Sequence, residues 1–168
     1  RDLLPAIRGV TQDEMPGYLS LVPTQLVQCL DAGEEVVGAM RSLSAILVGG
    51  AAISQHLLER ALNAGLKVRI TYGMTETSGG CVYDGEPMPG MTVRAVDWDG
   101  RTRLAFNGPT LMTRYLDAES PFFEEGGHRW LISGDMGVIR ASGKVEVNGR
   151  ADDVITSGGL SIAPGDRK

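Results

Sequence analysis

The stretch that most constrains the fold is the run from Leu43 to Gly73, where strand and helix patterns alternate. "LSAILVGG" is continuously apolar and stops at two glycines, which is typical of a strand buried on both faces. "ISQHLLERALNAGL" follows as a helix, with Ser54 as its expected N-cap and Gly65 as its expected C-cap. Its apolar stripe would contain Leu57, Leu58, Ala61 and Leu62. "KVRITYG" then predicts a second strand, so the order predicts a right-handed βαβ unit with parallel strands.

The segments on either side extend this pattern into an α/β fold. "YLSLVPTQLV" predicts a strand and then a helix with Pro23 in its first turn; Gly33 would end that helix, and "EEVVGAM" predicts another. From about residue 88 the apolar period becomes two, which predicts short antiparallel strands in "MTVRAVD", "RTRLAFN", "RWLIS", "MGVIR" and "KVEVNGR". "MGVIRASGKVEV" is a candidate hairpin. We therefore expect a parallel-sheet portion over residues 1–87 and a β-rich antiparallel subdomain over residues 88–150.

Composition excludes several classes of protein. The net charge of −5 does not suggest a nucleic-acid-binding face, and no apolar run approaches the roughly 20 residues that span a membrane. No signal peptide is visible at the start of the sequence. Cys29 and Cys81 are too few for a disulfide framework, which fits a cytoplasmic location. His56 and His128 are not near a cysteine pair, so a structural zinc site is not expected.

Polar and glycine residues follow both strands of the predicted βαβ unit. Gly49-Gly50 and "YGMTE" would emerge at the same carboxyl edge of the sheet, where open α/β sheets bind ligands. Tyr72 would offer a stacking face to a flat ligand held between them. The alternative is a plain strand-to-loop exit with a polar tip, of which any α/β protein has several.

Further polar residues lie in the β-rich half. Asp135 is in "ISGDMG" between two expected strands, where it could also be a turn former before Gly137. Arg150 and Asp152-Asp153 are in "GRADDVITSGG", which could equally be a solvated charged bend. Two adjacent aspartates suggest a metal only weakly, because their side chains rarely converge on one ion. No P-loop, dinucleotide-binding fingerprint or nucleophile elbow is present.

Taken in order, "VGGA", "YGMTET", "SGD" and "GRADDVITSGGLSI" resemble the adenylate-forming, AMP-binding superfamily of acyl-CoA synthetases, peptide-synthetase adenylation domains and luciferases. "LVPTQL", "FNGPTLMTRYLD" and "GGLSIAPGD" fit intervening segments of that superfamily. The resemblance covers nearly the whole chain and implies an internal fragment of the large N-terminal domain, with residues 151–168 as the hinge and the start of a C-terminal lid. Within the superfamily, the run Gly79–Gly85 most resembles actinobacterial o-succinylbenzoate–CoA ligases of menaquinone synthesis.

The resemblance implies a ligase that uses ATP, Mg²⁺ and CoA. In that superfamily, an acid carboxylate attacks the α-phosphorus of ATP and displaces pyrophosphate, and a CoA thiol then displaces AMP from the acyl-adenylate. Catalysis would rest on positioning and electrostatic stabilisation, with Thr75, Glu76 and Arg150 as the catalytic residues. Thr75 resembles the hydroxyl that donates to the α-phosphate, and Glu76 the carboxylate that holds Mg²⁺.

The same resemblance gives the other site residues their roles. Tyr72 resembles the aromatic residue that stacks on adenine, and Gly73 permits close backbone approach. Asp135 resembles the acid that accepts both ribose hydroxyls, and Arg150 the arginine that contacts the ribose. Asp152 matches the superfamily's hinge position, about which the C-terminal lid rotates. Gly49, Gly50 and Ala51 resemble the adenine-side wall of the site. Gly79 and Gly80 would lie on the side of the acyl substrate.

Two parts of the superfamily pattern are not in this sequence: a Ser/Thr/Gly-rich loop ending in Pro-Lys, and a lid lysine. We therefore expect the chain to hold the adenosine half of a site and to be inactive alone. Another acyl- or aryl-CoA ligase, or an adenylation domain, stays open as an alternative. So does a non-catalytic nucleotide-binding or scaffold relative, although the retained Thr75, Glu76, Asp135 and Arg150 count against it. The expected partners are small molecules, and the sequence leaves the oligomeric state open.

Overall fold

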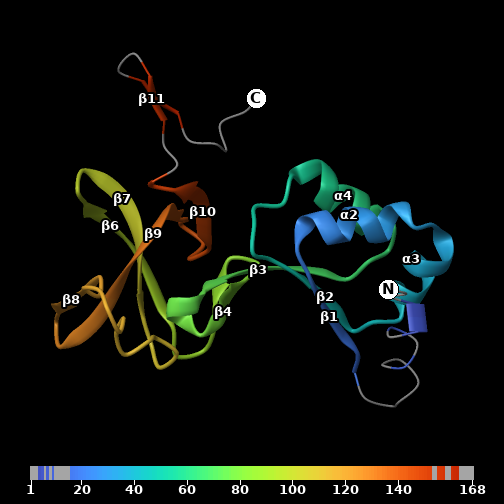
Figure 1. Ribbon diagram of the computed structural model, residues 1–168, viewed down its shortest axis with the longest axis horizontal. Helices are drawn as coiled ribbons and strands as arrows, with labels where there is room; N and C mark the ends of the chain where they lie inside the picture. The colour runs from blue at the N-terminus through green and yellow to red at the C-terminus, as the bar shows by residue number, and fades with distance from the viewer. Residues whose placement is uncertain are drawn as a thin grey trace. The chain divides into compact units, whose positions relative to one another are not determined.

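A computed structural model describes Leu4, Pro5, Ile7, Gly9, residues 16–152, and the backbone of two short paired strands, β11 (Ile155–Ser157) and β12 (Leu160–Ile162). Contacts between residues divide the chain into two units, Arg1–Tyr72 and Gly73–Lys168 (Figure 1). The division falls before residue 88, where the apolar period changes, because the residues that follow Tyr72 pack with the second unit. No helix in the described part of the chain is long and apolar enough to span a membrane.

The first unit is built on a parallel sheet, as the sequence predicted. Its strands pair in parallel in the order β1-β2-β3. They are β1 (Tyr18–Leu21), β2 (Ala45–Val48) and β3 (Val68–Met74). The helices are α2 (Pro23–Asp31), α3 (Glu34–Arg41) and α4 (Gln55–Asn63). Figure 1 shows α2 and α4 side by side. The β2–α4–β3 arrangement confirms the predicted βαβ unit.

Local sequence sets both ends of α4. The Ser54 hydroxyl accepts a hydrogen bond from the Leu57 N–H at 3.2 Å, which is the predicted N-cap. At the other end Gly65 has φ of +78°, and its N–H donates to the Leu62 carbonyl at 2.9 Å. The Leu66 N–H donates to the Ala61 carbonyl at 3.1 Å. These two bonds form a Schellman motif, whose left-handed residue is usually glycine.

One detail of α4 differs from the prediction, and Gly33 has a second role beside the predicted one. Leu62 is 51% exposed rather than buried, since it lies about 100° around the helix from buried Ala61 and outside the stripe that faces the sheet. Gly33, at φ of +98°, comes two residues after Asp31, the last residue of α2, so it ends α2 as predicted, and it is also the N-cap residue of α3.

Helix packing buries one face of the sheet. Ile46 and Val48 are buried, whereas Ala45 and Leu47 between them are half-buried. The prediction that β2 is fully buried on both faces is therefore wrong for this chain. Helices α2 and α4 cover the face that carries Ile46, whereas the face that carries Ala45 and Leu47 is only partly covered. The core of the unit consists of Ile7, Leu21, Leu26, Cys29, Leu30, Val37, Met40, Leu43, Ile46, Val48, Leu57, Ala61, Leu66 and Val68.

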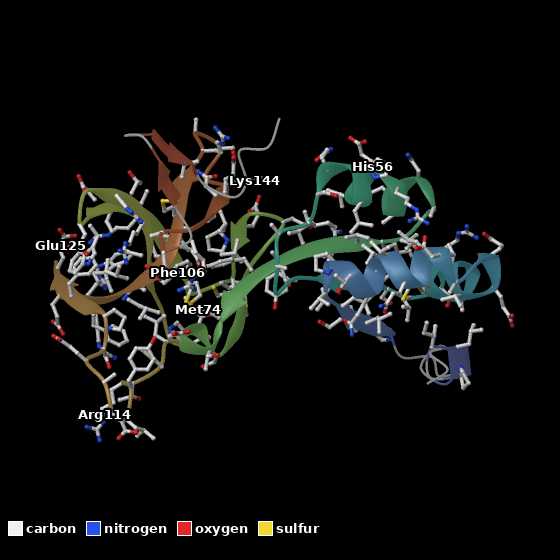
Figure 2. The ribbon with its side chains drawn as sticks, turned by 45° about the horizontal axis from the view of Figure 1, so that its top comes forward. His56, Met74, Phe106, Arg114, Glu125 and Lys144 are labelled. Carbon is white, nitrogen blue, oxygen red and sulfur yellow. The ribbon has the colours of Figure 1, made fainter. Side chains whose placement is uncertain are left out.

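The second unit contains a curled antiparallel sheet in the order β10-β9-β7-β6, with β8 paired to β9. Its strands are β6 (Thr92–Trp98), β7 (Arg101–Asn107), β8 (Phe122–Glu125), β9 (His128–Ile139) and β10 (Val145–Arg150). Phe106, labelled in Figure 2, is fully buried in it. The predicted β9–β10 hairpin is confirmed by the pairing of Val145 with Ile139.

Strand β9 corrects one expectation about Asp135. "RWLIS" and "MGVIR" form one continuous strand, so Asp135 lies within a strand and not between two. Pairing explains the continuity, since β7 and β8 hold the first part of β9 and β10 holds the second. The buried Ser133 hydroxyl accepts from the Asp135 N–H at 3.1 Å and donates to the Leu104 carbonyl at 2.9 Å.

Three strands between residues 79 and 125 were not predicted: β4 (Gly79–Tyr83), β5 (Glu86–Pro87) and β8. β4 and β5 pair around Asp84-Gly85, where φ is +51° and +82°. β8 and β9 pair around Gly126-Gly127, where φ is +61° and +76°. Positive φ at both central residues is the requirement of a type I′ hairpin turn. Asp-Gly and Gly-Gly were therefore usable sequence signals for these hairpins.

Candidate active site

In the first unit, the chain directly after β2 lies against Thr71 of β3. A Cβ on Gly49 would come 2.7 Å from the Thr71 carbonyl oxygen, so this position admits no side chain without movement of the backbone. The Gly49 N–H donates to the Leu21 carbonyl at 3.1 Å, and Gly50 turns the chain with φ of +75°. Gly49, one of the predicted wall residues, thus sits beside β3, the strand that contains Tyr72.

In the second unit, the residues after Tyr72 form a tight turn. Gly73 packs on the start of β4, where a Cβ would come 2.6 Å from the Gly80 Cα. Met74, labelled in Figure 2, ends β3 and leads into the 3₁₀ turn η1 (Thr75–Thr77). The predicted phosphate-contacting residue, Thr75, is exposed at the first position of this turn.

Thr77 holds the turn and was not among the predicted residues. Its side chain is 1% exposed, and its hydroxyl accepts from the Met74 N–H at 3.0 Å. The same hydroxyl lies 2.7 Å from the Gly79 carbonyl, to which it donates. A buried hydroxyl that is satisfied in this way fixes the local backbone. Glu76 is consequently presented from a rigid turn.

The Glu76 carboxylate is half-buried and bonded to a residue that the sequence analysis missed. The Tyr115 hydroxyl donates to Glu76 Oε1, across 39 positions of sequence. This hydrogen bond raises the pKa of the Tyr115 phenol, because an ionised phenol could not donate to the carboxylate, and burial acts in the same direction. No local pattern marks Tyr115, which appeared only within a segment that fits the superfamily.

Residues 108–121 are irregular, and hydrogen bonds hold them to the turn. The Met112 N–H donates to the Glu76 carbonyl at 2.8 Å, and the Ser78 hydroxyl donates to the Thr110 carbonyl at 2.8 Å. The Arg129 guanidinium donates to the Met112 and Thr113 carbonyls. Its Cζ lies 3.4 Å from the centroid of the Phe122 ring, a cation–π contact. Figure 2 shows Arg114, which precedes Tyr115 in the sequence, at the outer tip of this loop.

Asp135 and Arg150 are direct partners in the β9–β10 register. The Arg150 side chain lies over Gly134, where a Cβ would come 2.6 Å from its Nη2. Nη2 also lies 3.3 Å from Asp152 Oδ2, an ion pair between two exposed side chains. The charge of Arg150 lowers the pKa of Tyr115, against the larger effect of Glu76. The structure therefore brings both Glu76 and Arg150 within electrostatic range of Tyr115.

The predicted hinge follows an anchored residue. Ala151 is fully buried, its N–H donates to the Gly134 carbonyl at 2.8 Å, and its carbonyl accepts from the Arg101 guanidinium. Asp152 comes directly after it, and Asp153 lies outside the described residues. Gly79 and Gly80, the predicted acyl-side residues, are exposed and open β4. Their role stays a prediction.

A single carboxylate at this turn fits a magnesium ion that is shared with phosphates. No group of three or more His, Cys, Asp or Glu side chains that could hold a metal occurs among the described residues. Mg²⁺ commonly takes one or two protein carboxylates and completes its octahedron with substrate phosphates and water. Glu76 accepts from Tyr115 through Oε1, and no described residue bonds to its Oε2.

Comparison with known proteins shows the family of this chain. The sequence profile of the family described as "AMP-binding enzyme" matches residues 2–116. A probable 2-succinylbenzoate–CoA ligase of Mycobacterium tuberculosis is 40% identical over 151 residues, covering 88% of this chain and 38% of that protein. The chain thus spans well under half the length of the curated relatives it matches.

Solved structures of related enzymes also match the fold of this chain. The o-succinylbenzoate CoA synthetase of Bacillus subtilis with the acyl-adenylate intermediate matches with a TM-score of 0.80 at 27% identity, covering 99% of this chain and 37% of that one. The same enzyme in complex with ATP and a magnesium ion matches with a TM-score of 0.77 at 27% identity, covering 98% of this chain and 38% of that one. The profile match over more than half of the sequence shows the family: the chain belongs to the AMP-binding enzymes, the family that its glycine turns and its "YGMTE" motif resemble.

Proposed function

We propose that the whole protein is an ATP-dependent acid–CoA ligase acting on o-succinylbenzoate. It would form o-succinylbenzoyl-CoA, AMP and pyrophosphate through an acyl-adenylate, as a step of menaquinone biosynthesis. The observation that carries the proposal is the 40% identity to the mycobacterial 2-succinylbenzoate–CoA ligase over 88% of this chain. Its partners would be ATP, Mg²⁺, o-succinylbenzoate and CoA, in the cytoplasm.

The adenosine part of ATP would be bound by the glycine turn after β2 and by the aromatic residue of β3. Gly49, Gly50 and Ala51 would form the wall beside adenine, and Tyr72 would stack on the base. The close packing of Gly49 on Thr71 supports this role, since it removes any side chain from the turn. Gly73 would let the backbone approach the nucleotide.

The ribose and the phosphates would be bound by residues of the second unit. Asp135 would accept hydrogen bonds from the two ribose hydroxyls, a task suited to two carboxylate oxygens. Arg150, its partner in the register, would contact the ribose. Thr75 would donate to the α-phosphate from the exposed start of η1.

Glu76 would hold Mg²⁺ together with phosphate oxygens. The ion, when bound, neutralises charge that develops on the transferring phosphate. The supporting observation is that the carboxylate comes from a rigid turn and keeps one oxygen without a described hydrogen-bond partner. An anionic oxygen is the ligand that a hard cation prefers.

The acid would be bound beside Gly79 and Gly80. The second, non-reacting carboxylate of o-succinylbenzoate requires donors, and successive backbone N–H groups of a glycine-rich turn can provide them. Both glycines are exposed at the start of β4, and Gly79 has φ of +112°, a conformation that suits glycine.

Pyrophosphate release tests the proposal directly. The purified full-length protein would be assayed with ATP, Mg²⁺ and a panel of acids containing o-succinylbenzoate, benzoate and octanoate. We expect o-succinylbenzoate to give the highest kcat/KM, and CoA to convert the adenylate into a thioester. A higher kcat/KM for octanoate or benzoate would assign the enzyme to a different acid. No pyrophosphate release with any acid, together with retained ATP binding, would favour a non-catalytic nucleotide-binding relative.

A further inference from the structure

We propose that Tyr115 is a positioning residue for the metal-binding carboxylate, an inference that rests on the proposed function of Glu76. The Tyr115 hydroxyl donates to Glu76 Oε1, although neither the sequence pattern nor the superfamily resemblance gave Tyr115 a role. The hydrogen bond joins the 3₁₀ turn after β3 to residues 108–121, which lie between β7 and β8.

The scaffold around this bond is already held without the Tyr115 hydroxyl. The Met112 N–H bonds to the Glu76 carbonyl, and the Ser78 hydroxyl bonds to the Thr110 carbonyl. Arg129 adds its bonds to two carbonyls of the same segment. These contacts fix the two backbones relative to each other but do not touch the carboxylate. The Tyr115 hydroxyl is therefore the contact that acts on the Glu76 side chain itself.

The backbone of Tyr115 is fixed as well. Its N–H donates to the Ser120 hydroxyl at 2.8 Å, which closes a small turn within residues 115–120. The Tyr115 side chain is partly buried. A donor whose backbone is held in this way can select one orientation of the carboxylate that it contacts.

This arrangement has a direct consequence for the other carboxylate oxygen. With Oε1 bonded to the phenol, rotation of the carboxylate is restrained, and Oε2 has no hydrogen bond from a described residue. A cation that binds this carboxylate would meet a pre-oriented ligand and would lose less entropy in ordering it. Partners that orient a metal ligand typically change metal affinity or activity by about 10- to 100-fold when they are removed.

The test uses the full-length protein with ATP, no acid substrate and Mn²⁺ as the probe. Free Mn²⁺ is followed by its electron paramagnetic resonance signal, which gives the affinity of the ion for the enzyme–ATP complex without any turnover. Tyr115→Phe removes only the hydroxyl. We expect it to weaken Mn²⁺ binding about tenfold while the melting temperature stays close to that of the unchanged protein.

Ser78→Gly is the matched control. It deletes the bond to the Thr110 carbonyl between the same two segments and leaves the Glu76 carboxylate untouched. Ser78 has φ of +58°, so glycine suits its backbone. We expect Mn²⁺ affinity to be unchanged in this variant. Glu76→Gln serves as the reference for loss of the ligand itself.

The outcomes separate this inference from the proposed function. Unchanged Mn²⁺ affinity in Tyr115→Phe, with a loss in Glu76→Gln, overturns the positioning role alone. An equal loss in Tyr115→Phe and Ser78→Gly also overturns it, because both bonds would then act only by tethering the segment. If Glu76→Gln binds Mn²⁺ as well as the unchanged protein, the metal role of Glu76 is wrong, and the inference falls with it.

Discussion

The guanidinium of Arg150 lies directly over Gly134, where a Cβ would come 2.6 Å from Nη2 and 3.1 Å from Cζ. The two residues belong to neighbouring strands, and the Ala151 N–H bonds to the Gly134 carbonyl at 2.8 Å beside them. Glycine at this position therefore decides where the arginine of the proposed ribose site can lie. The glycine in "SGD" has a role that depends on a residue sixteen positions later.

Gly134→Ala should displace Arg150 with little loss of stability. The new methyl group meets the far end of a flexible side chain, not backbone, so the strand can stay in place while the guanidinium moves. In the full-length enzyme we expect the KM for ATP to rise several-fold with a melting temperature near that of the unchanged protein. An unchanged KM for ATP would show that the position of Arg150 over Gly134 has no part in nucleotide binding.

Glu76→Gln should slow adenylation at least about tenfold, the usual size of a comparable electrostatic contact. The substitution keeps the shape of the side chain and an oxygen that can accept from the Tyr115 hydroxyl, so it isolates the negative charge. The measurement is pyrophosphate release over a range of Mg²⁺ concentrations. Activity that equals the unchanged enzyme at limiting Mg²⁺ would rule out the metal role.

Asp152→Pro tests the hinge in the full-length enzyme. Proline fixes φ near −65° and restricts the preceding residue, so it should block rotation about Asp152. The superfamily resemblance implies a lid that leaves its adenylating position before CoA reacts, so if Asp152 is the hinge, thioester formation should slow far more than pyrophosphate release. Separate assays of the two half-reactions provide the measurement.

Asp152→Ala is the control for the proline variant. It removes the ion pair with Arg150, in which the two side chains are 55% and 67% exposed, and leaves the backbone free to rotate. Exposed ion pairs contribute little, so both half-reactions should stay near normal. Equal loss of both steps in the proline variant would indicate misfolding, and loss of neither would place the hinge elsewhere.

Gly38→Ala should stabilise the protein by about 1 kcal/mol, because glycine in a helix interior is that much less favourable than alanine. Gly38 lies within α3, and a Cβ there would meet nothing closer than Glu34 Oε1 at 3.9 Å. Denaturant unfolding of the full-length protein should show the gain. A decrease in stability would mean that this face of α3 is covered in the full-length protein.

Two buried thiols should reduce stability at high pH. Burial raises the pKa of Cys29 and of Cys81 in the folded protein, and both cysteines are free. The contribution of the two protonated thiols to the free energy of unfolding is fully present below the thiol pKa of the unfolded chain, about 8.5. It is lost as the pH rises through the higher pKa values of the folded protein. Unfolding free energies at pH 7.5 and pH 9.5 should therefore differ less in a Cys29→Ala, Cys81→Ala double variant. An identical difference in the two proteins would contradict this.

Features with short-range causes could be read from the sequence. Alternating apolar patterns gave the βαβ unit, Ser54 and Gly65 gave the ends of α4, and Asp99-Gly100 gave the β6–β7 turn, where φ is +53° and +71°. Asp84-Gly85 carried an equally local signal for the β4–β5 hairpin. These features are determined within a few residues, because caps and two-residue turns depend on backbone angles and nearby hydrogen bonds.

Other features were decided only by the tertiary structure. Leu62 fits a helical stripe but is exposed, since the sheet reaches only part of the way around α4. Asp135 lies inside β9 because three other strands, β7, β8 and β10, pair with β9 along its length. The bond from Tyr115 to Glu76 joins residues 39 positions apart. No local pattern encodes such a contact, because it exists only after β3, the 3₁₀ turn and residues 108–121 have packed together.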